Sequence, residues 1–250
     1  MFRSVLHRSG REPLGFVIPC LLSALLAVPA SADADATADE PADPLAGLEF
    51  RNIGPVNMSG RVADVEGIPG DPRVLWVGSA SGGIWKTTDG GISFDSVFDD
   101  QPVASIGDIA LAPSAPDVVW VGTGEGNPRN SVSFGKGVYR STDGGATWQF
   151  RGLEKTRYIT RLAVHPQDPD TAWVGALGSI FGPSEDRGVF KTTDGGETWT
   201  KTLFLDEHHG VSDLDIDPTN PKVLYAGMWR FERKLWNHRS GSEEGGVYRS

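Results

Sequence analysis

The sequence is poor in cysteine, in helical periodicity and in positive charge. Its single cysteine, Cys20, lies inside an N-terminal apolar stretch, so we expect neither a disulfide nor thiol chemistry in the folded part. The formal net charge is −10, which argues against nucleic acid and against anionic membrane as general partners. No segment beyond the first thirty residues repeats its apolar side chains with a helical period, so the sequence indicates an all-β protein.

The N-terminus has the order of parts found in a secretory signal. A basic region precedes an apolar run from Phe16 to Val28, and Ala30-Ser-Ala32 follows as a small-residue cleavage site. We expect cleavage after Ala32, a secreted or periplasmic protein, and no membrane span in the mature chain; an uncleaved anchor is the alternative. The predicted parts are a signal peptide, an acidic disordered linker and a repeat domain, at residues 1–32, 33–47 and 48–250.

A twelve-residue segment occurs three times and begins a fourth time. The copies are Gly83–Phe94, Gly137–Trp148, Gly188–Trp199 and the partial copy Gly246–Ser250. Each complete copy carries Ser/Thr-Thr-Asp-Gly-Gly and ends in an aromatic residue. Asp-Gly is a strong hairpin signal, because glycine accepts positive φ and Asp hydrogen-bonds the turn backbone. We therefore predict a β-hairpin in each copy.

A second shared stretch precedes each hairpin and fixes the length of the repeat. It begins at Val62, Ile106, Ile159 and Val211, and an aromatic residue and a glycine follow 14 and 16 residues later in every copy. A period near 50 residues with four short strands is typical of a propeller blade. We call the strands of a blade A to D, and in the second repeat we predict them at 106–111, 118–121, 137–140 and 147–150.

The predicted architecture is an all-β propeller with four-stranded blades, of which three are complete and most of a fourth is present. Closed propellers have four to eight blades. We therefore expect the chain to be the N-terminal part of a longer protein. Leu48–Ile53 resembles a D strand, and we expect it to close the ring against the last blade.

The hairpin pattern Ser/Thr-x-Asp-x-Gly-x-Thr-Trp resembles the Asp-box, or BNR repeat. The whole repeat, with Pro-x-x-Pro-x-x-x-Trp-Val-Gly before the box, is similar to sortilin-type and xyloglucanase-type propellers and to large secreted bacterial BNR proteins. A sortilin-type resemblance implies a channel that binds peptides without chemistry. A xyloglucanase-type resemblance implies a glycoside hydrolase with two carboxylates, one of them on blade one. The position matching that acid is Ala80; Asp99, Asp100 or Glu125 are possible substitutes.

We predict that the boxes themselves are structural. Each Asp caps its own hairpin and each aromatic residue packs against the neighbouring blade. The residues concerned are Asp89, Asp143, Asp194, Phe94, Trp148 and Trp199. His208 and His209 stand beside two acids, but adjacent residues on one strand point apart, so we predict no metal site, and no cofactor.

The loops between strands B and C carry the sequence's candidates for function. Between the B-strand glycine and the C-strand glycine, this loop has 4 residues in blade one but 14, 12 and 18 in the next three, while the D-to-A connections barely change. We predict that these B–C loops bind a peptide, protein or carbohydrate; packing on a neighbouring blade is the alternative. The candidate residues are Glu125, Asn127, Arg129, Asn130, Arg187, Trp229, Arg230 and Trp236.

Overall fold

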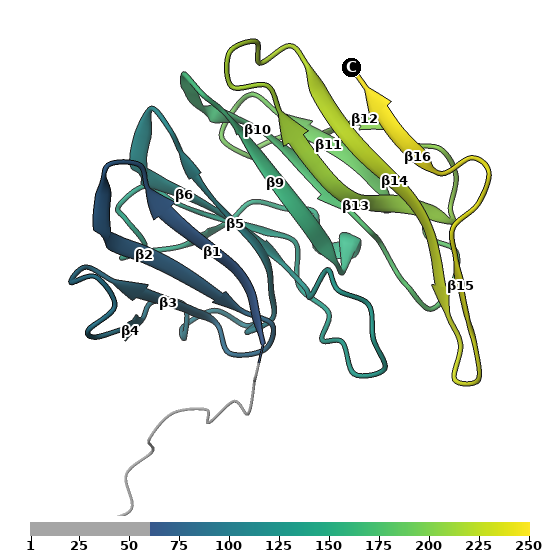
Figure 1. Cartoon of the computed structure of the whole chain (residues 1–250), viewed down its shortest axis with the longest axis horizontal. Coiled ribbons are helices and arrows are strands. Elements are labelled where there is room, and N and C mark those ends of the chain that lie inside the picture. Colours follow the sequence, from purple (N-terminus) through teal and green to yellow (C-terminus); the bar gives the residue numbers. More distant parts are fainter. Residues whose placement is uncertain (1–60) are drawn as a thin grey trace, which may run out of the picture. The chain divides into compact units, whose positions relative to one another are not determined.

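The computed structural model of the protein describes residues 61–250. These residues form four antiparallel sheets of four strands each (Figure 1), and no α-helix occurs among them. We call the sheets blades one to four. Blade one contains β1 (Val62–Ile68), β2 (Asp71–Ser79), β3 (Ile84–Thr87) and β4 (Asp95–Ser96). Blade two contains β5 (Ile106–Ala112), β6 (Ala115–Thr123), β7 (Val138–Ser141) and β8 (Gln149–Phe150), followed by the 3₁₀ turn η1 (Glu154–Thr156). Blade three contains β9 (Ile159–His165), β10 (Asp168–Ala176), β11 (Gly188–Thr192) and β12 (Thr200–Leu203). Blade four contains β13 (His209–Ile216), β14 (Leu224–Arg233), β15 (His238–Ser240) and β16 (Gly246–Arg249).

The first three blades follow the predicted A-B-C-D order, which confirms the all-β fold class. The D strand of blade two begins at Gln149 and not at Thr147 as predicted. The reason is local: the amide and hydroxyl of Thr147 both donate to Asp143, at 2.9 and 2.6 Å, which holds Thr147 in the turn.

Blade four departs from the prediction. Its predicted 18-residue loop contains a β-hairpin, because β14 runs on to Arg233 and pairs there with β15. The expected C strand is present as β16, which pairs with the first part of β14. The fourth strand of this sheet is therefore part of an expanded B–C connection, and no D strand of blade four occurs among residues 61–250.

The A strands β1, β5, β9 and β13 lie next to one another at the inner edge of the blades (Figure 1). The glycine 16 residues into each repeat lets the next blade come close. A Cβ on Gly122 would lie 2.3 Å from Cγ2 of Ile159, and one on Gly175 would lie 2.6 Å from Cγ1 of Val211. A side chain there would push the blades apart, which explains why the repeat has glycine at this position.

The hairpin tryptophans join each blade to the one before it. Nε1 of Trp148 donates to the carbonyl of Val97 at 2.6 Å, and Nε1 of Trp199 donates to the carbonyl of Arg151 at 2.6 Å. Both rings meet a B-strand tryptophan edge-on: Trp148 packs on Trp76, and Trp199 on Trp120 at 6.2 Å between ring centres. Such edge contacts add about 0.5–1.5 kcal/mol to the burial of the rings.

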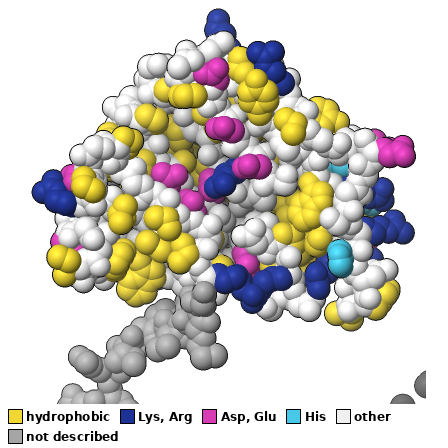
Figure 2. All heavy atoms as spheres, in the orientation of Figure 1, with side chains coloured by type: hydrophobic (Ala, Val, Ile, Leu, Met, Phe, Trp, Pro, Cys, Tyr) yellow, Lys and Arg dark blue, Asp and Glu magenta, His cyan; other side chains and the backbone are white. Residues whose placement is uncertain are grey.

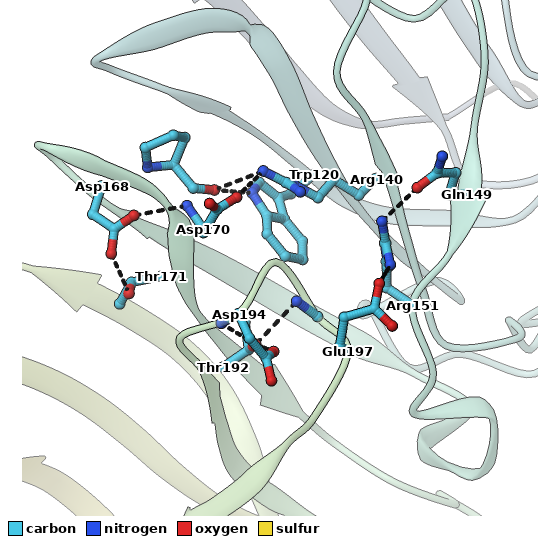
Figure 3. Close-up of polar contacts among 12 residues, drawn as sticks. Trp120, Arg140, Gln149, Arg151, Asp168, Asp170, Thr171, Thr192, Asp194 and Glu197 are labelled. Atoms are coloured by element: carbon cyan, nitrogen blue, oxygen red, sulfur yellow. Dashed lines mark hydrogen bonds and ion pairs between the residues drawn. The ribbon is translucent and has the colours of Figure 1, made fainter.

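A cation also contacts the B-strand tryptophan in the second joint. Figure 3 shows the guanidinium of Arg140 over Trp120, 5.0 Å from the ring centre, and paired with Asp170 of blade three. Nε1 of Trp120 donates to the carbonyl of Pro169 at 3.2 Å. Blades two and three are therefore joined by an edge-on pair of tryptophans, a cation–π contact and an ion pair.

The Asp side chain of each repeated hairpin is used within its own turn. In the second copy, Oδ1 of Asp143 accepts from the hydroxyl of Ser141 at 2.7 Å and from the amide of Thr147 at 2.9 Å. Asp194 makes the same bonds with Thr192 and Thr198, at 2.7 and 3.0 Å. These hydrogen bonds lower the pKa of both carboxyls to about 2, the side-chain bonds to Thr147 and Thr198 acting most strongly.

Three of the sequence-based expectations lie outside the described residues: the signal peptide, the acidic linker and the closing strand Leu48–Ile53. Between residues 61 and 250, no helix has the length and apolar character needed to cross a membrane.

Candidate functional site

The enlarged B–C connections of blades two, three and four meet on one face, which we call the loop face (residues 124–136, 177–187 and 229–245). Beneath them lies a small apolar cluster, separate from the three clusters between the sheets. Its members are Tyr158, Leu177, Ile180 and Phe231, with Val132 and Trp229 packed against them. The amide of Arg233 donates to the carbonyl of Ile180 at 2.7 Å, and its guanidinium donates to Asn130. The three connections therefore contact one another and form one surface.

Glu125 was predicted to be a ligand-binding residue of this face, but it is buried. Its side chain is 2% exposed and forms an ion pair with Arg61, the residue before β1. The backbone amide of Glu125 also donates to the hydroxyl of Ser105 at 3.0 Å. Oε1 has no hydrogen-bond partner among the described residues. Glu125 thus links blade two to the start of blade one, and a solvent-borne ligand does not reach it directly.

Arg187 is also buried, contrary to the prediction that its side chain contacts a ligand. It is 0% exposed, and Nη2 donates to the carbonyls of Gly182 at 3.3 Å, Phe231 at 3.2 Å and Ser179. Burial lowers the pKa of its guanidinium to about 10. The side chain therefore holds the blade-three loop against the blade-four hairpin, which places it in the framework of the loop face.

The two tryptophans of the blade-four connection have different environments. Trp229 is half-buried, packs 4.6 Å from the ring of Phe231 and donates from Nε1 to the hydroxyl of Ser240 at 3.1 Å. Trp236 stands at the end of the hairpin with 79% of its surface exposed. Arg230 is half-buried beside Trp229. Of the three, Trp236 is therefore the residue that a partner meets first.

The remaining predicted residues lie together in the exposed loop of blade two. Asn127, Arg129 and Asn130 are all exposed, and Nη2 of Arg129 donates to the hydroxyl of Ser131 at 2.9 Å. Asn130 accepts from Arg233 of the hairpin. These polar groups form the outer rim of the loop face.

Sequence reasoning missed a cleft of about 720 Å³ between blades two and three. Its walls come from the B–C loops of both blades and from the D-to-A connection, and they include Phe134, Lys136, Glu154, Arg157, Pro183 and Asp186. Phe134 is 60% exposed, with the guanidinium of Arg157 5.5 Å from its ring centre. Arg157 has a φ of 61°, a conformation that is costly for a residue other than glycine, and its carbonyl accepts from the amide of Gly135 at 2.7 Å. The volume suits a small ligand or one or two sugar rings.

A second cleft, of about 760 Å³, lies between blades three and four. Its walls include Trp173, Lys191, Leu203, Leu224 and Tyr248. In the other two joints the same place, beside the B-strand tryptophan, is occupied by Trp148 or Trp199. This cleft is therefore equivalent to a blade joint, and we do not assign it to a ligand.

The A strands also bring charged side chains together at the inner edge, where Figure 2 shows acidic side chains around a basic one. Arg161 of blade three donates to Asp108 of blade two at 2.9 Å and to Asp213 of blade four at 2.9 Å. Oδ1 of Asp64, in blade one, lies 4.0 Å from Nη1 of Arg161. All four residues occupy the third position of the shared A-strand stretch. The repeat alignment could have found this group, since equivalent positions of a propeller face the same axis.

Two of these carboxylates also join neighbouring A strands. Oδ2 of Asp64 accepts from the amide of Ile109 at 3.0 Å, and Oδ2 of Asp108 accepts from the amide of Leu162 at 2.7 Å. Burial raises the pKa of Asp108 to about 7, and the charge of Asp64 acts in the same direction. Asp108 is thus a buried carboxyl that titrates near neutral pH.

The position of the implied blade-one acid is closed to solvent. Ala80 is buried, and its amide donates to the carbonyl of Arg61 at 3.1 Å. Asp99 and Asp100 are exposed, and Asp99 accepts from the hydroxyl of Ser96.

His209 is buried between Asp206, at 2.7 Å, and the hydroxyl of Ser242, at 2.6 Å. Within residues 61–250, no group of three or more His, Cys, Asp or Glu is arranged to hold a metal.

The geometry can be compared with known proteins. No family model matches the chain. A curated xyloglucanase of Paenibacillus sp is 26% identical over 197 residues, which cover 69% of this chain and 19% of that enzyme. Among solved structures, a GH74 enzyme of Niastella koreensis matches with a TM-score of 0.55 and 23% identity, over 75% of this chain and 28% of the other. An ancestral GH74 enzyme matches with a TM-score of 0.53 and 20% identity, over 75% and 26%.

These similarities and the four-stranded sheets assign the chain to the β-propeller fold. The chain spans about a fifth of the curated relative and about a quarter of each solved structure. At this level of identity the likeness to the solved structures shows the fold.

Proposed function

We propose that this protein is an Asp-box propeller that acts outside the cytoplasm and binds a peptide or carbohydrate, without chemistry, at its loop face. The observation that carries the proposal is the 720 Å³ cleft between the enlarged B–C loops, with the exposed ring of Phe134 in its wall. Aromatic faces stack on sugar rings or apolar side chains. The sortilin-like resemblance and the predicted signal peptide support the same role.

The framework of the loop face suits binding. Arg187 and the cluster of Leu177, Ile180 and Phe231 fix the loops from beneath, so little conformational entropy is lost when a ligand binds. Lys136 and Glu154 lie 3.9 Å apart at the cleft, and Arg157 adds a second cation. These polar groups can orient a ligand that stacks on Phe134.

The test is a binding screen with xyloglucan, β-glucan oligosaccharides and short peptides, followed by variants. We expect Phe134→Ala to weaken the ligand found by about 1–3 kcal/mol. Phe150→Ala is the matched control, since Phe150 is a half-exposed aromatic residue on an outer strand, and it should leave affinity unchanged. Equal affinity for both variants and the parent would refute the assignment of the cleft.

The alternative is a glycoside hydrolase of the xyloglucanase type. Its support is the similarity to a protein named xyloglucanase and the near-neutral pKa of Asp108 beside Asp64, a pattern suited to an acid and an ionised partner. Against it, Ala80 occupies the position of the family's blade-one acid, and Asp108 is buried, with Oδ2 bound by the amide of Leu162. Release of reducing ends from xyloglucan that disappears in Asp108→Asn, with binding retained, would establish the hydrolase and end the non-catalytic proposal.

A further inference from the structure

The blade-four hairpin formed by the end of β14 and by β15 has an unusual surface. Its strands pair from Phe231↔Ser240 to Arg233↔His238, and the amide of Lys234 closes the turn on the carbonyl of Asn237 at 2.8 Å. At the tip, Leu235 is 100% exposed and Trp236 is 79% exposed. Two adjacent large apolar side chains are therefore exposed to solvent. The hairpin that carries them protrudes from the rest of blade four (Figure 1).

The charge behind this tip is opposite to that of the protein as a whole. The segment from Trp229 to Ser240 has four Lys or Arg and one Glu, a local net charge of +3 in a chain of net charge −10. Lys234, Arg239 and His238 are exposed, and Nζ of Lys234 also lies 2.6 Å from the carboxylate of Glu232. Figure 2 shows this cluster of Lys, Arg and His side chains over the hairpin, at the lower right.

The hairpin is held firmly at its base. Phe231 lies in the apolar cluster, and the amide of Arg233 donates to the carbonyl of Ile180 at 2.7 Å. The amide of Gly241 donates to the carbonyl of Arg230 at 2.9 Å and continues the ladder to the foot of the hairpin. The tip thus projects from a fixed support, and among residues 61–250 nothing covers Leu235 and little covers Trp236.

We propose that this hairpin docks the protein on an anionic lipid surface, with Leu235 and Trp236 inserted at the interface. A convex apolar tip gains burial only in a partner that is concave or can deform around it, and a lipid interface deforms. Tryptophan prefers the headgroup level, and cations just behind the tip meet lipid phosphates. The positive charge of the hairpin complements an anionic headgroup layer, while the acidic remainder of the protein keeps the contact local.

This inference is independent of the cleft at Phe134, which is on the same face but uses other residues. It also refines the expectation drawn from net charge: the chain as a whole repels anionic surfaces, and the hairpin is the exception. The contact is peripheral, because two inserted residues do not span a bilayer.

The experiment is co-sedimentation of the purified protein with vesicles of neutral phosphatidylcholine alone or with one-third anionic phosphatidylglycerol. We expect binding to the anionic vesicles that falls steeply with added salt. The double change Leu235→Ser and Trp236→Ser should lower the partition coefficient at least tenfold. Each of Lys234→Gln and Arg239→Gln should lower it about fivefold, on anionic vesicles only.

The matched control is Ile92→Ser. Ile92 is 88% exposed and lies in the β3–β4 connection, at the opposite end of the C strand from the B–C connections. Both sets of changes are at exposed positions, and circular dichroism verifies that each variant is folded. No sedimentation with anionic vesicles, or equal losses in Ile92→Ser and in the tip variant, would overturn the proposal. The proposal would also be overturned if the hairpin bound an acidic peptide or polysaccharide and anionic vesicles did not displace that ligand.

Discussion

Replacement of Trp199 by alanine tests whether the blade joints carry the stability of the fold. Trp199 is half-buried, meets Trp120 edge-on at 6.2 Å and donates from Nε1 to the carbonyl of Arg151 at 2.6 Å. Replacing a fully buried tryptophan by alanine costs about 3–5 kcal/mol, and replacing a half-buried one costs less. The lost hydrogen bond accounts for about 1 kcal/mol and the aromatic contact for about 0.5–1.5. We expect Trp199→Ala to lower the free energy of unfolding by about 2–3 kcal/mol.

Two further variants separate the contributions. Trp199→Phe keeps a ring against Trp120 but removes the N–H donor, so it should cost about 1 kcal/mol. Trp236→Ala removes a tryptophan that is exposed at the hairpin tip, and should change stability by less than about 0.5 kcal/mol. The free energies come from urea unfolding followed by circular dichroism, with equal m values required for comparison. If Trp199→Ala and Trp236→Ala had the same small effect, the joint would not stabilise the fold.

Three other predictions concern single positions. The pKa of Asp108 is about 7 in the folded state and near 4 in the unfolded state, so folding favours the protonated carboxyl. The stability gained from this protonation is fully present below about pH 4 and is lost as pH rises to 7. The urea midpoint should therefore fall over that range, and it should fall less steeply in Asp108→Asn. Asp143→Ala should lower the melting temperature by several degrees, and an unchanged melting temperature would contradict the turn geometry. Arg187→Met should leave three carbonyl groups without a donor and raise hydrogen exchange in the blade-three loop and the hairpin, while exchange in blade one stays as it was.

The sequence by itself determined the parts of the fold that depend on local chemistry. The Asp-Gly-Gly hairpins and the A, B and C strands of the first three blades could be predicted, because they depend on turn chemistry and on periodicity. The repeat also fixed the number of blades in the described residues. The residue type at a fixed repeat position is enough to predict local structure when every copy of the repeat gives that position the same neighbouring residues.

The tertiary structure decided which loop residues are available to a ligand. Glu125 and Arg187 are charged residues in loops, which from the sequence alone favours exposure. Both are buried because their partners, Arg61 and the carbonyl of Phe231, come from other blades, and that burial requires the blades to be assembled. The hairpin in blade four also depends on the tertiary structure, because β14 continues past the sheet and pairs there with β15.

The group at the inner edge shows the same division. The third position of the A strand could be read from the repeat as Asp64, Asp108, Arg161 and Asp213, but only the ring arrangement brings one cation within reach of three acids. The raised pKa of Asp108 follows from its burial between strands, which no local pattern encodes. Local sequence therefore specified the blades, and the packing of the blades created the sites, because burial and charge pairing depend on residues far apart in the chain.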